Sequence, residues 1–324
     1  MRAPAVLATV GAAAASAWWR VRAVQAVAPE LRDPVLYLPQ TLHNRPALRV
    51  ARRRGAFPSP IHPGVIVTEA DAGVLVYRPE GSTGQTGALV WAHGGGFVLG
   101  APEYDHEWCS AVAAELGIVV VNVDYGLAPE HPFPAALDDC LSALRWLHQH
   151  AAVLGVDRGR VAVGGASAGG GLAAALAQRA ADAGVPVAFQ LLRYPMLDDR
   201  TVQRRPRGRR GRLAWTPASN RFGWRCYLGR RPGAGTLPPY AAAARRADLA
   251  GLPPAWVGVG ELDLFHDEDV GYARRLEEAG VPCELVVVPR MYHGADGVRP
   301  DAPSMRAFRS SAVDALRRAI GSRD

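Results

Sequence analysis

Near its middle the chain runs through Val161-Ala162-Val163-Gly164-Gly165-Ala166-Ser167-Ala168-Gly169-Gly170, where a short apolar run gives way to a segment of helical character. Gly165-x-Ser167-x-Gly169 matches G-x-S-x-G, the pattern of a sharp strand-to-helix turn that exposes a serine hydroxyl. The turn places Ser167 at a helix N-terminus, where free amides and the helix dipole favour negative charge. A plain glycine-rich turn is the alternative, and the strand–turn–helix context favours a nucleophile.

On both sides of this turn, short apolar runs alternate with helical segments. Continuous Val, Ile and Leu runs are typical of parallel strands that are buried on both faces. The runs are Ala88–Ala92, Ile118–Val123, Val161–Val163, Ala188–Leu192, Ala255–Val259 and Glu284–Val288. The helical segments are Trp108–Leu116, Ala135–Leu154, Ala168–Ala183, Asp267–Ala279 and Ala302–Ile320. The alternation predicts an α/β fold with a mostly parallel, doubly wound sheet, preceded by an antiparallel hairpin of Gly64–Thr68 and Gly73–Tyr77.

Composition excludes several classes of protein. The 324 residues are 49% hydrophobic and 21% charged, as in ordinary globular chains. The net charge is +7, and all 37 basic residues are arginine. The densest basic run, 204–212, contains Pro and Gly and no aromatic residue, so we interpret it as a solvated loop and expect no nucleic-acid binding.

The cysteines give no sign of a metal site. The four are far apart in the sequence, without the spacing of metal ligands, and we expect buried thiols and neither metal nor cofactor. They are Cys109, Cys140, Cys226 and Cys283.

The N-terminal residues allow two interpretations. Residues 1–17 are apolar after Arg2 and end in Ala15-Ser16-Ala17, which has the outline of a cleavable signal peptide. Arg20 and Arg22 interrupt the run before about 20 apolar residues accumulate, so we expect no transmembrane span. We favour a cytoplasmic protein with a helical extension, and an exported protein is the alternative.

Two segments lack the character of a sheet. Residues 198–250 contain no strand run and are too long for an ordinary connection, so we expect a cap over one end of the sheet. Residues 1–55 are expected to contribute to this cap, and residues 56–324 to form the catalytic domain that carries the cap as an insertion. We expect Phe97, Trp215 and Phe222 to line a substrate pocket beneath it.

Glycines follow the first predicted parallel strand, at the edge where active sites of open α/β sheets lie. The sequence there is His93-Gly94-Gly95-Gly96-Phe97. Consecutive glycines let backbone amides face a neighbouring oxygen, which is the requirement for an oxyanion hole. A phosphate-binding loop is excluded because G-x-x-x-x-G-K-[ST] is absent.

An acid and a histidine follow two later strands. Asp263 lies in the loop after Ala255–Val259, whereas Asp267 and Glu268 fall at the start of a helix, where acids are ordinary. His293 follows the last predicted strand. The order Ser167, Asp263, His293 is that of the triad in α/β-hydrolases.

The combined motifs resemble the hormone-sensitive-lipase-like branch of the α/β-hydrolases, over roughly residues 60–320. They are His93–Phe97, Asp124–Pro134, Gly164–Gly170, Asp263–Glu268 and His293-Gly294. The resemblance implies a carboxylesterase with a helical cap that acts on short- to medium-chain acyl esters. It also implies that Asp124 and Glu130 hold the glycine loop by hydrogen bonds. Ala166 departs from the family's usual Asp or Thr, and Leu264 from its Pro.

These residues together predict acyl transfer to water. We expect Ser167 to attack, His293 to act as base and Asp263 to orient it, while amides of Gly95, Gly96 and Ala168 hold the oxyanion. Supporting positions in the two motifs are His93, Gly94, Gly165 and Gly169. An amidase or lactonase with the same triad and a non-catalytic small-molecule receptor are the alternatives. Whether the protein is a monomer or a dimer stays open.

Overall fold

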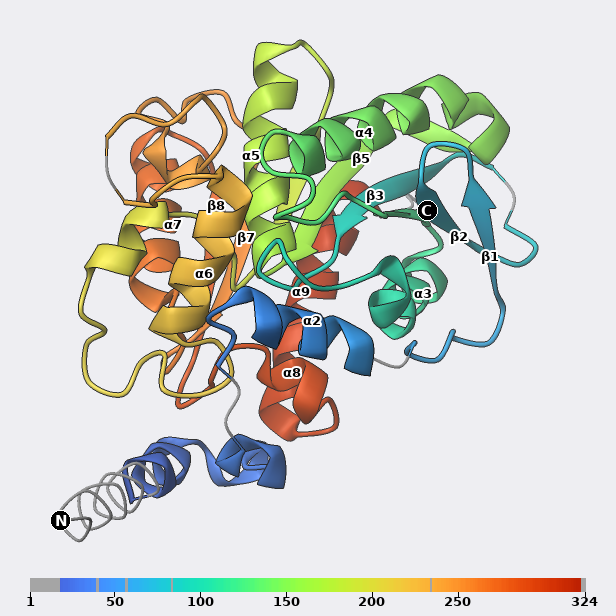
Figure 1. Ribbon diagram of the computed structural model, residues 1–324. Helices are drawn as coiled ribbons and strands as arrows, with labels where there is room; N and C mark the ends of the chain where they lie inside the picture. The colour runs from blue at the N-terminus through green and yellow to red at the C-terminus, as the bar shows by residue number, and fades with distance from the viewer. Residues whose placement is uncertain (1–17, 39–40, 56–57, 83, 234, 322–324) are drawn as a thin grey trace, which may run out of the picture.

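The computed structural model describes residues 18–38, 41–55, 58–82, 84–233 and 235–321, and has a central sheet with helices on both faces (Figure 1). The strands are β1 Val65–Ala70, β2 Val74–Pro79, β3 Thr86–Ala92, β4 Val119–Val123, β5 Val156–Ala166, β6 Phe189–Arg193, β7 Ala255–Gly260 and β8 Cys283–Val288. The α-helices are α2 Arg45–Arg54, α3 His106–Leu116, α4 Ala135–Leu154, α5 Ala168–Asp182, α6 Pro217–Leu228, α7 His266–Glu278, α8 Ala295–Val298 and α9 Pro303–Ile320. Residues 18–26 are also helical.

The strands lie in the order β1-β2-β4-β3-β5-β6-β7-β8. β1 pairs with β2 and β2 with β4 in antiparallel fashion, whereas every other neighbouring pair is parallel. The predicted hairpin, the six predicted parallel strands and the five predicted helices are therefore confirmed, with ends that differ by a few residues.

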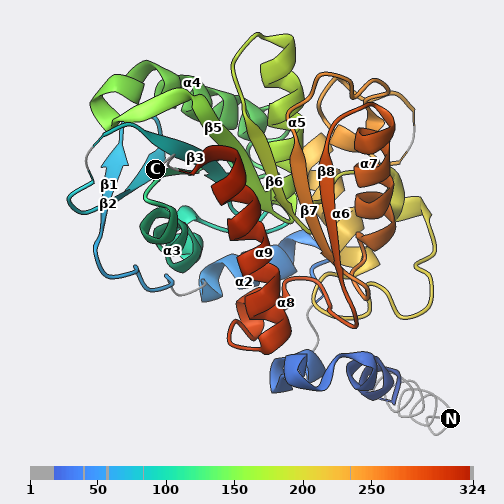
Figure 2. The same cartoon turned by 180° about the vertical axis from the view of Figure 1, so that it is seen from behind.

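Two apolar cores lie on opposite faces of the sheet, because successive strand residues point to opposite sides. Val119 and Val121 of β4 face the core beneath α4, α5 and α7. Val120, between them, faces the other core, which α3 and α9 cover. Figure 2 shows α3 and α9 in front of the sheet in the reverse view.

The N-terminal arm, residues 18–55, packs against the sheet domain rather than standing apart from it. Val24, Val27 and Leu31 are fully buried in the α9 core. Leu42 donates its amide hydrogen to Ser219 Oγ of α6 at 2.9 Å, which joins the arm to the 198–250 segment. That segment contains α6 and two short 3-10 helices, Asp199–Gln203 and Ala243–Arg245, and no strand among its described residues.

The cysteines depart from the sequence expectation in one position. Cys109, Cys140 and Cys226 are buried, but Cys283 at the start of the edge strand β8 is only half-buried. Burial raises the pKa of all four thiols. In the described ranges, no group of three potential His, Cys, Asp or Glu ligands is arranged around a common point, and no helix combines the length and apolarity needed to cross a bilayer.

The glycines of the central turn are required by a close approach of α5 to its neighbouring strands. A Cβ atom on Gly169 would lie 2.0 Å from the carbonyl oxygen of Ala92 in β3. A Cβ atom on Gly165 would lie 2.3 Å from the carbonyl of Gly169. Both neighbours are backbone atoms of regular elements, so neither can move aside cheaply.

We predict that Gly169→Ala destabilises the fold by about 2–3 kcal/mol, because α5 would have to move away from β3. Gly271→Ala in α7 is a matched control, since a Cβ there meets nothing within 4 Å. That control should leave stability unchanged or raise it by up to about 1 kcal/mol. Urea unfolding measures both, and a wild-type midpoint for Gly169→Ala would contradict the packing argument.

Candidate active site

Ser167 sits in strained backbone between β5 and α5, with φ 56° and ψ −117°. Hydrogen bonds from both sides hold it there. Its amide donates to the carbonyl of Arg193 at 2.9 Å, and its carbonyl accepts from the amides of Gly171 and Met196. Positive φ is costly for a non-glycine residue and persists only when the surroundings fix it. The turn therefore holds the Ser167 side chain at the carboxyl edge of the sheet.

His293 and Asp263 reach this serine from the loops after β8 and β7. The Nε2 atom of His293 lies 2.9 Å from Ser167 Oγ, and its Nδ1 lies 2.8 Å from Asp263 Oδ2. Asp263 is fully buried, and its other oxygen accepts from the Phe265 amide at 2.9 Å. The structure thus brings the three predicted residues into one hydrogen-bonded chain.

The two other candidate acids, Asp267 and Glu268, bind partners other than His293. Asp267 pairs with Arg210 at 2.5 Å on the surface. Glu268 accepts hydrogen bonds from the amides of Leu197 and Asp198, and burial raises its pKa to about 8. Neither carboxylate makes a hydrogen bond to His293 within the described residues.

Three aromatic rings surround His293. Tyr194 and Phe265 contact it edge-on, with ring centroids at 4.9 and 5.2 Å, and Trp215 lies at 6.4 Å. Only 10% of the His293 side chain remains exposed. The rings exclude water from the histidine and limit its rotation.

A buried ion pair anchors the His293 loop to the end of β6. Arg193 pairs with Asp296, which also accepts from the Tyr194 hydroxyl at 2.8 Å. The Arg193 guanidinium stacks over Trp108 at 4.3 Å. The sequence analysis missed this pair. Its signal was an arginine directly after a predicted buried strand, because an arginine buried there needs a counter-ion.

The glycine loop after β3 offers unpaired donors beside Ser167. Within the described part of the chain, the amides of Gly95, Gly96 and Ala168 donate to no protein acceptor. Gly95 has φ 126° and Gly96 φ 62°, in the region that favours glycine. A Cβ atom on Gly94 would lie 3.6 Å from Ser167 Cβ, which places the loop directly against the serine. The three amides can hold a negatively charged oxygen formed there.

His93 and Tyr125 support this loop from beneath. The rings stack at 4.2 Å, and the Tyr125 hydroxyl donates to the His93 carbonyl at 2.8 Å. His93 Nδ1 lies 2.7 Å from the Gly94 carbonyl. Burial lowers the pKa of His93, so the ring is neutral at pH 7.

The resemblance implied that Asp124 and Glu130 hold the glycine loop by hydrogen bonds. This expectation is wrong for Asp124, and Glu130 reaches the loop only through another residue. No described residue donates to the Asp124 carboxylate, because the neighbouring Tyr125 turns inward and makes the bond to the loop instead. Glu130 binds Arg52 of α2 at 3.0 Å. Arg52 in turn donates to the carbonyls of Val98 and Ala128 at 2.9 Å each, close to the glycine loop.

A cavity of about 790 Å³ opens onto Ser167. Trp215 and Ala166 line it, so the departure at position 166 replaces a polar group in the wall with a methyl group. Its lining comes from the arm, the glycine loop, the Asp105 turn, the Ser167 turn, the end of β6, the 198–250 segment and the His293 loop. The residues are Thr41, Leu42, Pro46, Ala47, Val50, Ala51, Gly94, Gly95, Gly96, Leu99, Asp105, Ala166, Ser167, Tyr194, Ala214, Trp215, His293 and Gly294.

Two predicted pocket residues are not part of this wall. Phe97 is buried and stacks on Tyr227 at 4.0 Å, because its positive φ of 65° turns the ring into the core beneath the glycine loop. Phe222 lies on α6 and packs against the core outside the cavity.

Asp105 lines the same cavity, and no sequence motif pointed to it. Its Oδ2 accepts from the Trp91 indole at 2.6 Å. It is the one acidic residue among the described lining residues, so it adds a polar group to a largely apolar wall.

Comparisons with known proteins agree with this fold. A family model described as alpha/beta hydrolase fold matches residues 89–296. Carboxylesterase NlhH of Mycobacterium tuberculosis is 35% identical over 311 residues, which cover 89% of this chain and 96% of that protein. Esterase LipI of the same organism is 36% identical over 269 residues, covering 80% and 83%. A solved structure titled Bacterial Heroin Esterase has a TM-score of 0.84 and 37% identity, and covers 92% of this chain and 99% of that one.

Proposed function

The chain belongs to the hormone-sensitive-lipase-like branch of the α/β-hydrolase family, and we propose that it hydrolyses short- to medium-chain carboxylic esters through an acyl-enzyme intermediate. The observation that carries the proposal is the hydrogen-bonded chain from Asp263 through His293 to Ser167. The esterase names of its relatives support esters as the substrate class.

In the proposed first half-reaction, His293 Nε2 takes the Ser167 proton while Oγ attacks the ester carbonyl carbon. The carbonyl oxygen becomes an oxyanion that accepts hydrogen bonds from the amides of Gly95, Gly96 and Ala168. Each such donor contributes on the order of 3 kcal/mol to lowering the barrier. His293 then gives its proton to the departing alcohol, which leaves the acyl group on Ser167.

Water repeats the sequence in the second half-reaction. His293 takes a proton from water, the hydroxide attacks the acyl carbon, and the returned proton restores the Ser167 hydroxyl as the acid leaves. Buried Asp263 accepts from Nδ1 throughout, which fixes the tautomer and stabilises the imidazolium. No step requires a metal or an organic cofactor.

We propose that two segments form the cap of this site. They are residues 1–55, whose described part is the arm, and residues 198–250. Thr41, Val50 and Trp215 support that assignment, because they line the cavity above Ser167. An amidase or lactonase would use the same triad, and no contact in the cavity favours either. The presence of all three triad side chains argues against a non-catalytic receptor.

Ser167→Ala should lower kcat for p-nitrophenyl butyrate on the order of 10⁶-fold, because the nucleophile is lost. Far-UV circular dichroism should stay unchanged, since the methyl group fits the space of the hydroxymethyl group. Turnover near the wild-type rate would show that another residue performs the chemistry.

Asp263→Asn should lower kcat by about 10⁴-fold, because an amide stabilises the wrong tautomer of His293. Asp267→Asn is the matched control: it removes the same charge four residues away, at a surface pair with Arg210. Its kcat should stay within a few-fold of the wild type. The opposite ranking of the two variants would identify Asp267 as the triad acid.

Activity toward p-nitrophenyl esters should be highest for acyl chains of about four to six carbons. Each further CH₂ adds only about 0.8 kcal/mol of burial, and only while the cavity has room. Trp215→Ala removes a large ring from the wall and so enlarges the cavity, which should shift the optimum to longer acyl chains. Phe222→Ala removes an aromatic ring outside the cavity and should leave the profile unchanged. The same profile in Trp215→Ala as in the wild type would contradict this view of the pocket.

A further inference from the structure

Positive charge is concentrated in two segments of the chain. Residues 18–55 contain eight arginines and only two acids, and residues 204–212 contain six arginines and no acid. The remainder of the chain contains 23 arginines and 28 acids. The net charge of +7 therefore arises from the arm and the 204–212 loop, and the rest of the molecule is slightly acidic.

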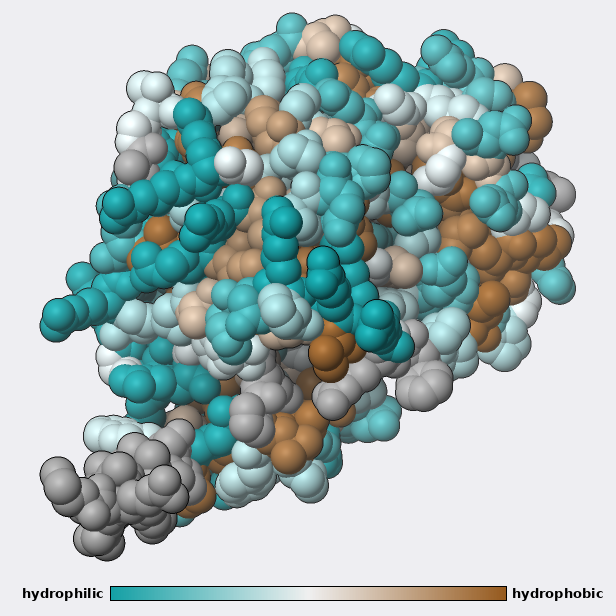
Figure 3. Space-filling view, viewed as in Figure 1, coloured by the Kyte–Doolittle hydropathy of each residue, from teal (hydrophilic) through white to brown (hydrophobic). Residues whose placement is uncertain are grey.

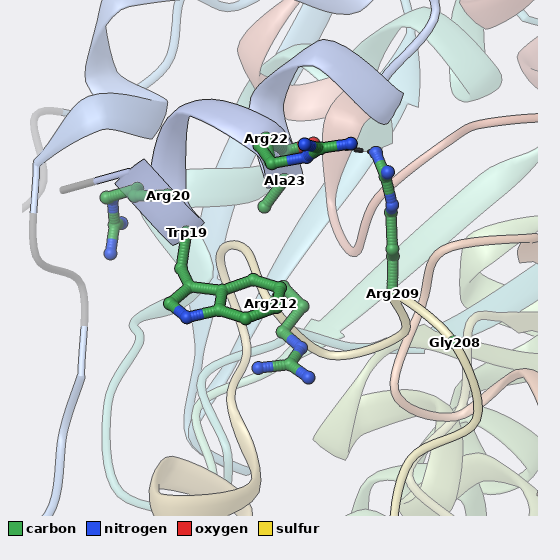
Figure 4. Close-up of a pocket in the computed structure, with 7 residues that line it drawn as sticks. All are labelled: Trp19, Arg20, Arg22, Ala23, Gly208, Arg209 and Arg212. Carbon is green, nitrogen blue, oxygen red and sulfur yellow. Dashed lines mark hydrogen bonds between the residues drawn. The ribbon is translucent and has the colours of Figure 1, made fainter. Parts of the chain in front are cut away.

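These two segments meet in space. Figure 4 shows the hollow between them, with Trp19 and Arg22 of the arm on one side and Arg209 and Arg212 of the loop on the other. An Arg209 guanidinium N–H donates to the carbonyl of Arg22 at 2.8 Å and fastens the loop to the arm. Figure 3 shows long hydrophilic side chains over the left and centre of the face viewed in Figure 1.

The arm also exposes large apolar side chains beside this charge. Six of the eleven exposed large apolar residues in the described chain lie between residues 18 and 50. Trp18 is 50% exposed, and Trp19 and Leu38 are each 60% exposed. The Arg20 side chain joins the helical turn of Trp18 and Trp19 to the segment before Leu38, because it donates to the carbonyls of Leu36, at 2.8 Å, and Leu38. The opposite side of the arm is buried in the core, so the exposed side is a fixed surface.

We propose that this surface binds the face of an anionic lipid bilayer. We call it the arm surface and define it by Trp18, Trp19, Val21, Tyr37, Leu38, Arg22, Arg209 and Arg212. Tryptophan and tyrosine rings favour the membrane–water interface, and arginines beside them are attracted by anionic headgroups. The arm surface thus matches a bilayer in both charge and apolarity.

Two other occupants fit less well. A symmetric dimer would bring the same cationic surface of two copies together, which like charges oppose. A nucleic acid would match the charge but would leave Trp18, Val21 and Leu38 without an apolar partner.

Bilayer binding would bring the cavity close to lipid. The arm that carries the arm surface continues into α2, where Pro46, Ala47 and Val50 line the cavity. Val50 is 48% exposed, so the apolar wall reaches the outside. Apolar esters dissolved in a membrane could then enter without crossing bulk water. The binding itself does not depend on the proposed hydrolysis.

The test is sedimentation of the full-length protein with phosphatidylcholine vesicles prepared with and without phosphatidylglycerol. The protein should sediment with the anionic vesicles, remain in solution with the neutral ones, and be released as the salt concentration rises. Absence of binding to the anionic vesicles at low salt would overturn the proposal.

Paired variants distinguish binding through the arm surface from attraction by the net charge of the whole protein. Arg22→Glu with Arg212→Glu should weaken vesicle binding at least about tenfold, and so should Trp18→Ala with Trp19→Ala. Arg145→Glu with Arg158→Glu is the matched control, because it removes the same charge from exposed arginines of α4 and β5, away from the arm. None of these four arginine side chains makes a hydrogen bond within the described residues. Turnover of dissolved p-nitrophenyl butyrate should stay unchanged in all three variants, which reports intact folding.

Three results would contradict the assignment. An equal loss of vesicle binding in the control variant, Arg145→Glu with Arg158→Glu, would show that the net charge of the protein alone determines binding. A wild-type dimer that the tryptophan variant converts to a monomer, measured by light scattering, would assign the surface to a second copy. Release from vesicles by a short DNA duplex that binds the same surface would assign it to nucleic acid.

Discussion

The close approach of α5 to β3 is the contact on which the proposed site depends. Gly169 allows it, because any side chain there would overlap the Ala92 carbonyl. With the helix this near, Ser167 must turn with positive φ at the point where the glycine loop leaves β3. The strained serine and the unpaired amides of Gly95 and Gly96 thus lie together beside this contact. The parallel order of β3, β5, β7 and β8 then brings Asp263 and His293 to the same edge.

A second layer of contacts keeps each of these groups in place. The Arg193–Asp296 pair and Tyr194 anchor the His293 loop, and the Phe265 amide holds Asp263. Fixed partners of this kind reduce the reorganisation needed as charge develops in the reaction. Burial also raises the pKa of Asp269, which lies in α7 near Asp263. Burial and the neighbouring carboxylates of Glu268 and Asp263 thus favour the protonated, neutral form of Asp269.

The sequence was most informative where a residue's environment follows from its neighbours along the chain. Runs such as Ala88–Ala92 and Ala255–Val259 predicted strands, because a strand buried on both faces must be apolar throughout. The meeting of Ser167, Asp263 and His293 at one edge of the sheet could also be predicted, since each residue follows a strand. The direction of the Phe97 ring could not be predicted, because it depends on the positive φ of Phe97, which no sequence pattern indicates. Arg193 and Asp296 were missed for another reason: they are 103 residues apart, and no local pattern pairs them.

The central claim is that Ser167 is the nucleophile of a covalent mechanism. The most direct measurement is peptide mass spectrometry after reaction with a p-nitrophenyl phosphonate, which transfers its phosphonyl group to an activated serine and releases p-nitrophenol. The account predicts one phosphonyl group per chain, on Ser167, with activity lost in proportion to the labelled fraction. A phosphonyl group on another residue in inactivated protein, or full labelling of Ser167 with activity retained, would contradict it.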